Sequence, residues 1–183
     1  LAPPGAIKHK ELDTTTNVFG QELSLPFFVA PVGSLRTLWP MADAVASQVA
    51  GEFGTAMALS TLSQTPMESV AEASNGPNWF QLYLCGGTET AKRGISRARD
   101  AGFSALLLTI DTAVSGNRIV HERMKPMDAV SSLFSGPRKL KRALHRVKLG
   151  PQVLPRTGWL WRHWRDGGLL PFCNIINEHG EPM

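Results

Sequence analysis

Two polar residues and an arginine follow an apolar run at residues 103–118, F-S-A-L-L-L-T-I-D-T-A-V-S-G-N-R. The run is typical of a strand that carries Thr109 and Asp111 at its carboxyl end, and because strand side chains alternate between faces, these two share a face. A buried carboxylate is costly unless something pairs with it. Arg118 follows across a Ser-Gly-Asn turn, and a guanidinium suits a carboxylate ligand. The pattern therefore predicts chemistry at a strand end.

Other apolar runs have a similar design. They span residues 25–31, 56–60 and 79–83. Gly33 follows the first run, Ser60 ends the second, and the third presents a glutamine and a tyrosine on one face, Gln81 and Tyr83. Barrel enzymes build their sites from such carboxyl ends of parallel strands. The simpler alternative is that these polar residues only satisfy one another inside a barrel.

Helical patterns separate the apolar runs. They cover residues 41–52, 66–73 and 88–101, and a hairpin pattern around Phe19-Gly20-Gln21 spans residues 12–23 before them. Regular alternation of strands and helices predicts an α/β fold with a parallel sheet. No G-x-G-x-x-G follows any strand, which argues against an open dinucleotide-binding sheet and favours a barrel.

The length limits how much of a barrel the chain can form. A complete (β/α)₈ barrel needs about 250 residues, and this chain has 183. We therefore expect the first four βα units of a TIM (β/α)₈ barrel, preceded by the hairpin. In this interpretation residues 1–118 are the N-terminal half of the barrel. Residues 119–183 are a long basic loop segment after the fourth strand, and the chain ends before a fifth.

Several spaced motifs together resemble one enzyme family. They are D-T-T-T at 13–16, A-P-V-G at 30–33, L-W-P at 38–40, L-S-T at 59–61, W-F-Q-L-Y at 79–83 and L-T-I-D-T-A-V-S-G-N-R at 108–118. In this order they resemble the FMN-dependent α-hydroxy-acid dehydrogenases and oxidases, which include glycolate oxidase, lactate dehydrogenases and mandelate dehydrogenase. The L-W-P motif is most similar to the mandelate dehydrogenase branch.

The resemblance implies an FMN cofactor and assigns residues to it. The loop that lies along the isoalloxazine ring matches Pro31, Val32 and Gly33. The side chains that hydrogen-bond the ring match Ser60, Gln81 and Thr109. We expect the enzyme to oxidise a lactate- or mandelate-like 2-hydroxy acid to the 2-oxo acid. Leu62 and Gly33 are smaller than the residues common at their positions, which favours a substrate bulkier than glycolate.

The resemblance also assigns catalytic roles to three residues. Tyr83 matches the phenol that touches the substrate, Arg118 matches one of two arginines that hold its carboxylate, and Asp111 matches the carboxylate that orients a catalytic histidine. That histidine, the second arginine, a lysine near flavin N1 and the phosphate-binding loop belong to the second half of the family's barrel. We therefore predict that these 183 residues alone are inactive.

The positive charge of the chain is concentrated in one segment. The formal net charge is +4, but residues 121–166 alone carry +8. Within them, residues 138–147 combine a helical apolar stripe with basic flanks, and three tryptophans follow at positions 159, 161 and 164. Basic amphipathic segments with tryptophan bind anionic lipid surfaces. We expect peripheral membrane binding; a solvated loop is the alternative, and nucleic-acid binding is disfavoured because no binding module surrounds the segment.

The remaining features concern the compartment and the partners. Cys85 and Cys173 have neither disulfide nor metal spacing, which fits a reducing compartment, and no metal is predicted. The sequence shows no secretory signal and no bilayer-spanning apolar run. We expect a cytoplasmic protein at the inner face of the cell membrane, a quinone or respiratory-chain acceptor, and a homo-oligomer. Two other interpretations stay open: a non-catalytic basic half-barrel module that binds membrane or nucleic acid, and a different phosphate-binding barrel.

Overall fold

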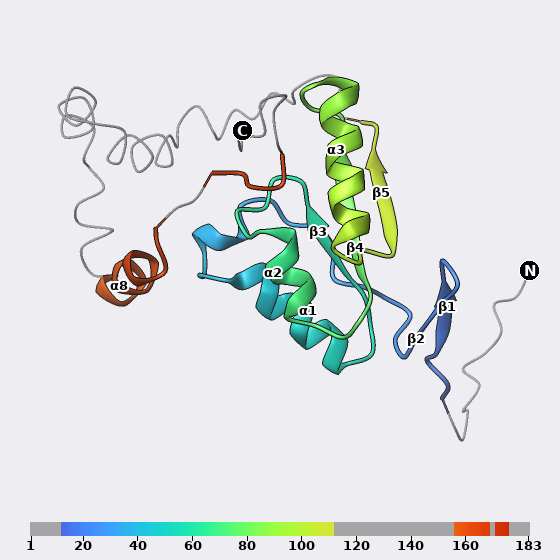
Figure 1. The fold of residues 1–183 in the computed structure, drawn as a ribbon. Helices are drawn as coiled ribbons and strands as arrows, with labels where there is room; N and C mark the ends of the chain where they lie inside the picture. The colour runs from blue at the N-terminus through green and yellow to red at the C-terminus, as the bar shows by residue number, and fades with distance from the viewer. Residues whose placement is uncertain (1–11, 112–155, 169–170, 176–183) are drawn as a thin grey trace, which may run out of the picture.

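The computed structural model describes residues 12–111, 156–168 and 171–175, so Arg118 and residues 121–155 lie outside the described part of the chain. The elements follow one another in the order strand, strand, then alternating helices and strands (Figure 1). They are β1 (Thr16–Val18), β2 (Gln21–Leu23), the 3-10 helix η1 (Leu35–Thr37), α1 (Ala42–Glu52), β3 (Met57–Ser60), α2 (Met67–Glu72), β4 (Asn78–Tyr83), α3 (Gly87–Asp100), β5 (Ala105–Thr109) and α8 (Thr157–Arg165).

A parallel three-stranded sheet forms the centre of the fold, with strand order β3-β4-β5. The helices α2 and α3 are the connections between consecutive strands, as parallel pairing requires. The register places Ser60 beside Gln81 and Tyr83 beside Thr109. The prediction of an α/β fold with a parallel sheet is confirmed, and the helices and strands predicted over residues 41–111 agree closely with the observed ones.

The first expected strand, residues 25–31, is much shorter than predicted. It contributes a single parallel bridge between Val29 and Met57, made by hydrogen bonds from Val29 N to Ala56 O (2.9 Å) and from Ala58 N to Val29 O (2.9 Å). The flanking Pro26 and Pro31 have no N–H group to donate, which limits the ladder to the residues between them. The expectation of a full first strand was wrong.

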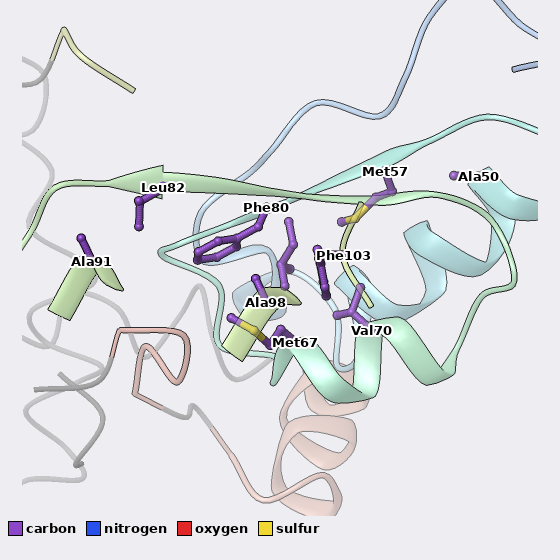
Figure 2. Close-up of a cluster of buried hydrophobic side chains, with 10 residues drawn as sticks. Ala50, Met57, Met67, Val70, Phe80, Leu82, Ala91, Ala98 and Phe103 are labelled. Atoms are coloured by element: carbon purple, nitrogen blue, oxygen red, sulfur yellow. The ribbon is translucent and has the colours of Figure 1, made fainter. Parts of the chain in front are cut away.

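One face of the sheet packs against the helices α1, α2 and α3. Outward side chains of β3 and β4 meet apolar residues of the helices in a continuous core, drawn in Figure 2. The buried members are Ala50, Met57, Leu59, Met67, Val70, Phe80, Leu82, Ala91, Ala98 and Phe103. The rings of Phe80 and Phe103 pack edge to face with centroids 6.3 Å apart. This core fixes the sheet, and therefore also the residues on its opposite face.

The opposite face carries the small residues of β3, the buried Trp79 and the hairpin β1–β2. Leu23 of the hairpin packs with Trp79 in a second apolar cluster, and the indole N–H of Trp79 donates to Gln21 Oε1 at 3.0 Å. The turn residues Phe19 and Gly20 have φ angles of 54° and 77°, as tight hairpin turns require. The hairpin predicted around residues 19–21 is thus confirmed, and it covers the amino ends of the strands.

The helix α8 lies within the segment predicted as a long basic loop, and it packs against η1 and the residues around it. Trp159 donates its indole N–H to Thr37 O at 3.0 Å, and the buried His163 places Nε2 2.8 Å from Arg36 O. Trp159, grouped by sequence with the lipid-binding tryptophans, is therefore a packing residue. Among the described residues, no helix is long and apolar enough to cross a membrane.

Candidate active site

A row of polar side chains joins the carboxyl ends of the three parallel strands. The Ser60 hydroxyl at the end of β3 donates to Gln81 Oε1 at 3.2 Å. Gln81 Nε2 on β4 donates to the Thr109 hydroxyl at the end of β5 at 2.7 Å. Because paired residues of a parallel sheet lie on the same face, these groups all point away from the helices. The sequence analysis predicted all three at strand ends, and the structure brings them together.

The amide of Gln81 has a defined orientation because its oxygen receives two hydrogen bonds. Besides Ser60, the N–H of Thr61 donates to Gln81 Oε1 at 3.2 Å, so the nitrogen faces Thr109. One N–H of the amide and the hydroxyl proton of Thr109 are not used within this row. Gln81 is buried and Thr109 half-buried. The row therefore presents hydrogen-bond donors to whatever lies on this face of the sheet.

The segment that follows the Val29 bridge runs beside the end of β3. Ser34 N donates to Leu62 O at 2.9 Å, which brings Gly33 next to the polar row. A Cβ atom at Gly33 would lie 3.2 Å from Leu62 Cβ and 3.8 Å from Ser60 Oγ. The first of these distances is tighter than an ordinary van der Waals contact. The backbone of residues 31–33 thus borders the same site as Ser60, Gln81 and Thr109.

Thr61 is a site-forming residue that the sequence analysis did not identify. Its buried hydroxyl donates to Gln81 O and accepts from Tyr83 N at 3.1 Å. The side chain therefore continues the β3–β4 pairing by one step beyond the backbone ladder. The L-S-T run contained the residue, but only the register of β3 against β4 shows what the hydroxyl does.

The three residues predicted to be catalytic, Tyr83, Asp111 and Arg118, do not belong to the hydrogen-bonded row of Ser60, Gln81 and Thr109. Tyr83 ends β4 and is half-buried, and Asp111 lies two residues beyond β5 and is exposed. Arg118 lies outside the described residues, so its predicted proximity to Asp111 stays a prediction. Asp111 was predicted to orient a catalytic histidine, and the described residues contain one histidine, His163. Its ring nitrogens lie 3.0 Å from Trp159 O and 2.8 Å from Arg36 O, so they do not face Asp111.

The buried carboxylate of Asp43 on α1 holds the loop that follows β3 through hydrogen bonds. Asp43 on α1 accepts hydrogen bonds from Ser63 Oγ at 2.8 Å and Thr65 Oγ1 at 2.9 Å. Burial raises the pKa of Asp43 above its ordinary value, although the two hydroxyls and the charge of Arg36 act in the opposite direction. The carboxylate therefore fixes residues 63–65, the continuation of the strand that carries Ser60.

Comparisons with known proteins match the chain to one enzyme family. The sequence profile of the FMN-dependent dehydrogenase family matches residues 1–156. An L-lactate dehydrogenase of Ectopseudomonas mendocina is 34% identical over 173 residues, which are 94% of this chain and 42% of that protein. A 2-hydroxyacid oxidase of Dictyostelium discoideum is 35% identical over 119 residues, which are 64% of this chain and 31% of that protein.

A solved structure extends the match to the fold. A mandelate oxidase that holds a C4a-OH-FMN adduct superposes with a TM-score of 0.62 at 29% identity, covering 66% of this chain and 37% of that one. The chain thus spans less than half the length of these relatives. The family predicted from the spaced motifs is confirmed. With the profile matched over most of its length, this chain belongs to the FMN-dependent dehydrogenase family.

Proposed function

We propose that this chain supplies part of the active site of an FMN-dependent enzyme that oxidises a 2-hydroxy acid to the 2-oxo acid. The observation that carries the proposal is the hydrogen-bonded row Ser60–Gln81–Thr109, which lies beside the Gly33 backbone at the carboxyl end of the sheet. The relatives named above are a 2-hydroxyacid oxidase, an L-lactate dehydrogenase and a mandelate oxidase. A lactate- or mandelate-like substrate is the corresponding proposal for this chain.

The donor set on this face suits a flavin. The rim of the isoalloxazine ring carries carbonyl oxygens and ring nitrogens that accept hydrogen bonds. Among the residues that the structure describes, one Gln81 N–H and the Thr109 O–H are left as donors. Within the described residues, the N–H groups of Val32 and Gly33 also have no hydrogen-bond partner. Pro31, Val32 and Gly33 would line the ring, and Ser60, Gln81 and Thr109 would bind it. FMN, when bound, supplies the acceptor for the two electrons that leave the substrate.

The catalytic part of the proposal rests on Tyr83, Asp111 and Arg118. Tyr83 would contact the substrate, and Arg118 would hold its carboxylate with a planar fork of donors. Asp111 would orient a histidine and stabilise its protonated form. Because the described histidine is engaged with Trp159 and Arg36, this base must come from elsewhere. We expect no turnover by the 183 residues alone.

The architecture that fits this function is the first part of a (β/α)₈ barrel, with residues 1–118 as barrel units and residues 119–183 as a segment after the fourth strand. The outer face of β5 supports this arrangement. Leu106 and Leu108, which are 41% and 51% exposed, share a face with the buried Phe80 and Leu82 of β4. An apolar strand face of this kind needs cover, as a further helix of a barrel would provide.

We propose that the protein binds peripherally to an anionic membrane. A quinone or another respiratory-chain component would then accept the electrons. On the solvent side of α8, Trp161 and Trp164 are 59% and 72% exposed, and their rings pack 5.2 Å apart. The guanidinium of Arg162 lies 4.3 Å from the ring centroid of the half-exposed Trp39. Exposed indoles beside arginines suit the headgroup region of a bilayer. A cytoplasmic location at the inner membrane face and a homo-oligomer complete the proposal.

The experiment that tests the cofactor uses the complete gene product that contains these residues. After purification and gel filtration, the absorbance spectrum and the flavin released by denaturation give the amount and identity of the bound cofactor. We expect FMN in a ratio near one per chain. A colourless protein that takes up no added FMN would contradict the proposal and favour the non-catalytic module.

The membrane partner is tested with the variant Trp161→Ser/Trp164→Ser. Co-sedimentation with phosphatidylglycerol vesicles should fall strongly in this variant, while binding to phosphatidylcholine vesicles is weak in both proteins. The matched control is Phe53→Ser, because Phe53 is similarly exposed but lies at the end of α1. Equal co-sedimentation of the unmodified protein, the double variant and Phe53→Ser would contradict the membrane proposal. Binding of the unmodified protein to a DNA column would support the nucleic-acid alternative.

A further inference from the structure

The short helix η1 (Leu35–Thr37) begins two residues after Gly33 and carries a buried arginine, Arg36. The guanidinium of Arg36 forms an ion pair with the Asp166 carboxylate. It also donates to the backbone carbonyls of Asp166 at 2.5 Å and Gly168 at 3.3 Å. All of these acceptors lie at the carboxyl end of α8, at least 130 residues away in the sequence. Arg36 therefore joins two distant segments.

The contact is reciprocal, because side chains of α8 also hold the backbone of η1. The carbonyl oxygen of Thr37 accepts from the Trp159 indole, and that of Arg36 lies 2.8 Å from His163 Nε2. His163 is buried, and its ring stacks near Trp159 with centroids 4.1 Å apart. Two carbonyls of η1 and two carbonyls after α8 are thus bound across one interface. We call this set of contacts the Arg36 clamp.

The clamp controls one side of the segment that borders the candidate site. On the other side, Ser34 N donates to Leu62 O, which follows β3. Gly33 directly precedes Ser34, and a Cβ atom at Gly33 would lie 3.2 Å from Leu62 Cβ and 3.8 Å from Ser60 Oγ. Within the described residues, the Val32 and Gly33 amides gain no hydrogen bond of their own. Their position therefore depends on the attachments at Ser34 and Arg36.

We propose that Arg36 is a positioning residue, which acts through Asp166 and α8 to hold the backbone of residues 31–34 in the geometry that FMN binding requires. The inference rests on the proposed function, because it assumes that this backbone faces the flavin. It goes beyond that function in making α8 a determinant of the flavin environment. Lysine cannot replace Arg36, because one ammonium group cannot reproduce a fork that reaches a carboxylate and two carbonyls together.

The test compares Arg36→Lys with Arg97→Lys in the complete gene product. Arg97 is a matched control, because it pairs with Glu68 at 2.6 Å and donates to Cys173 O at 2.7 Å. It therefore also ties the C-terminal segment to the fold, but from α3. The first readout is hydrogen exchange of the Ser34, Thr37 and Leu38 amides, which donate to Leu62 O, Ser34 O and Leu35 O. The second is the affinity of the bound flavin for sulfite, which adds to flavin N5.

We expect Arg36→Lys to raise the exchange rates of these amides at least about tenfold and to weaken sulfite binding at least about fivefold, as the loss of one to two hydrogen bonds implies. Arg97→Lys should leave both unchanged. Trp159→Phe removes the hydrogen bond to Thr37 O but keeps an aromatic ring beside His163. It should change both in the same direction by less, and it keeps the test decisive if Arg36→Lys does not fold. Asp166→Asn, which removes the ion pair but keeps the backbone carbonyls of Asp166 and Gly168, should change both in the same direction by less than Arg36→Lys.

Two results would overturn the inference. Unchanged exchange in Arg36→Lys and Trp159→Phe would show that the clamp does not hold the segment. Faster exchange with unchanged sulfite affinity would show that the clamp is structural and does not position the flavin-facing backbone. Failure of the proposed function is recognised separately, because the unmodified protein would then hold no FMN while the exchange rates still reported the clamp.

Discussion

The amide nitrogen of Gln81 lies 2.7 Å from the hydroxyl of Thr109, and this contact joins two neighbouring parallel strands at their carboxyl ends. The amide oxygen is held by Ser60 Oγ and Thr61 N, so the nitrogen faces β5. Three strands are therefore linked by side chains where a barrel enzyme places its site. The arrangement fixes which donors remain for a ligand, and it makes each member of the row open to a specific test.

Thr109→Val keeps the shape of the side chain but removes the hydroxyl. Gln81 then loses an acceptor, and the proposed flavin loses a donor. A neutral hydrogen bond contributes about 1 kcal/mol, so we expect the Kd of FMN to rise about fivefold. Fluorescence titration of the apo form of the complete gene product with FMN measures this change. Thr109→Ser, which keeps the hydroxyl, is the control, and equal affinities for all three proteins would exclude Thr109 from the cofactor site.

Asp111→Asn tests the proposed catalytic carboxylate. Asp111 is exposed beyond β5 and takes no part in the polar row, so its loss should leave FMN affinity unchanged. The asparagine cannot stabilise a protonated histidine, and removal of positioned acid–base catalysis typically costs about 100-fold or more in rate. Steady-state kinetics with a 2-hydroxy acid should show this fall in kcat. A variant with normal kcat would show that Asp111 is a surface residue.

The stability of the protein should depend on pH through Asp43. Burial raises the pKa of this carboxyl above the unfolded value of 3.8. The stability that the protonated form contributes is therefore complete below pH 3.8 and is lost as the pH rises through the higher folded value. Asp43→Asn keeps an oxygen that can accept from Ser63 and Thr65 but has no charge to bury.

Urea denaturation of the complete gene product at a series of pH values measures this effect. We expect the free energy of unfolding of Asp43→Asn, relative to the unmodified protein, to increase as the pH rises above 3.8. The control is Val45→Ala on the same helix, because Val45 is 47% exposed and carries no charge. Its difference from the unmodified protein should not vary with pH. A pH-independent difference for Asp43→Asn would contradict the assignment of a raised pKa.

The apolar core under the helices should tolerate little truncation. Phe80 is 1% exposed and packs against Phe103, and truncation of a buried phenylalanine to alanine costs about 3–5 kcal/mol. Phe80→Ala should lower the free energy of unfolding by that amount in urea denaturation. Phe53→Ala, at a position 65% exposed, should change it by less than about 1 kcal/mol. Similar losses in both variants would argue against this core.

The sequence predicted most of the central fold because its signals are local. Apolar runs separated by helical patterns predicted β3, β4 and β5, and their alternation with helices predicted a parallel sheet. The strand register came only from the structure. The same residues, Ser60, Gln81 and Thr109, were predicted as site residues because they end these strands. The first strand was predicted too long. The apolar pattern of residues 25–31 favours a full strand, but Pro26 and Pro31 limit its pairing to one bridge at Val29.

The long-range contacts could not be predicted from local patterns. Nothing near Arg36 in the sequence shows that it is buried, because its partner Asp166 is 130 residues away. Trp159 and Trp161 both lie in the basic segment that was predicted to bind membranes. Trp159 nevertheless packs on Thr37, whereas Trp161 is exposed. Thr61 gained its role only through the register of β3 against β4. These features depend on how distant segments pack together on the sheet.

Anaerobic reduction of the flavin tests the central claim most directly. The complete gene product is purified with its flavin, and L-lactate and both enantiomers of mandelate are added separately under argon while the absorbance of the oxidised flavin is recorded. The account predicts that at least one of these acids bleaches the flavin and is recovered as the 2-oxo acid. A flavin that stays oxidised with every 2-hydroxy acid offered would contradict the proposed activity.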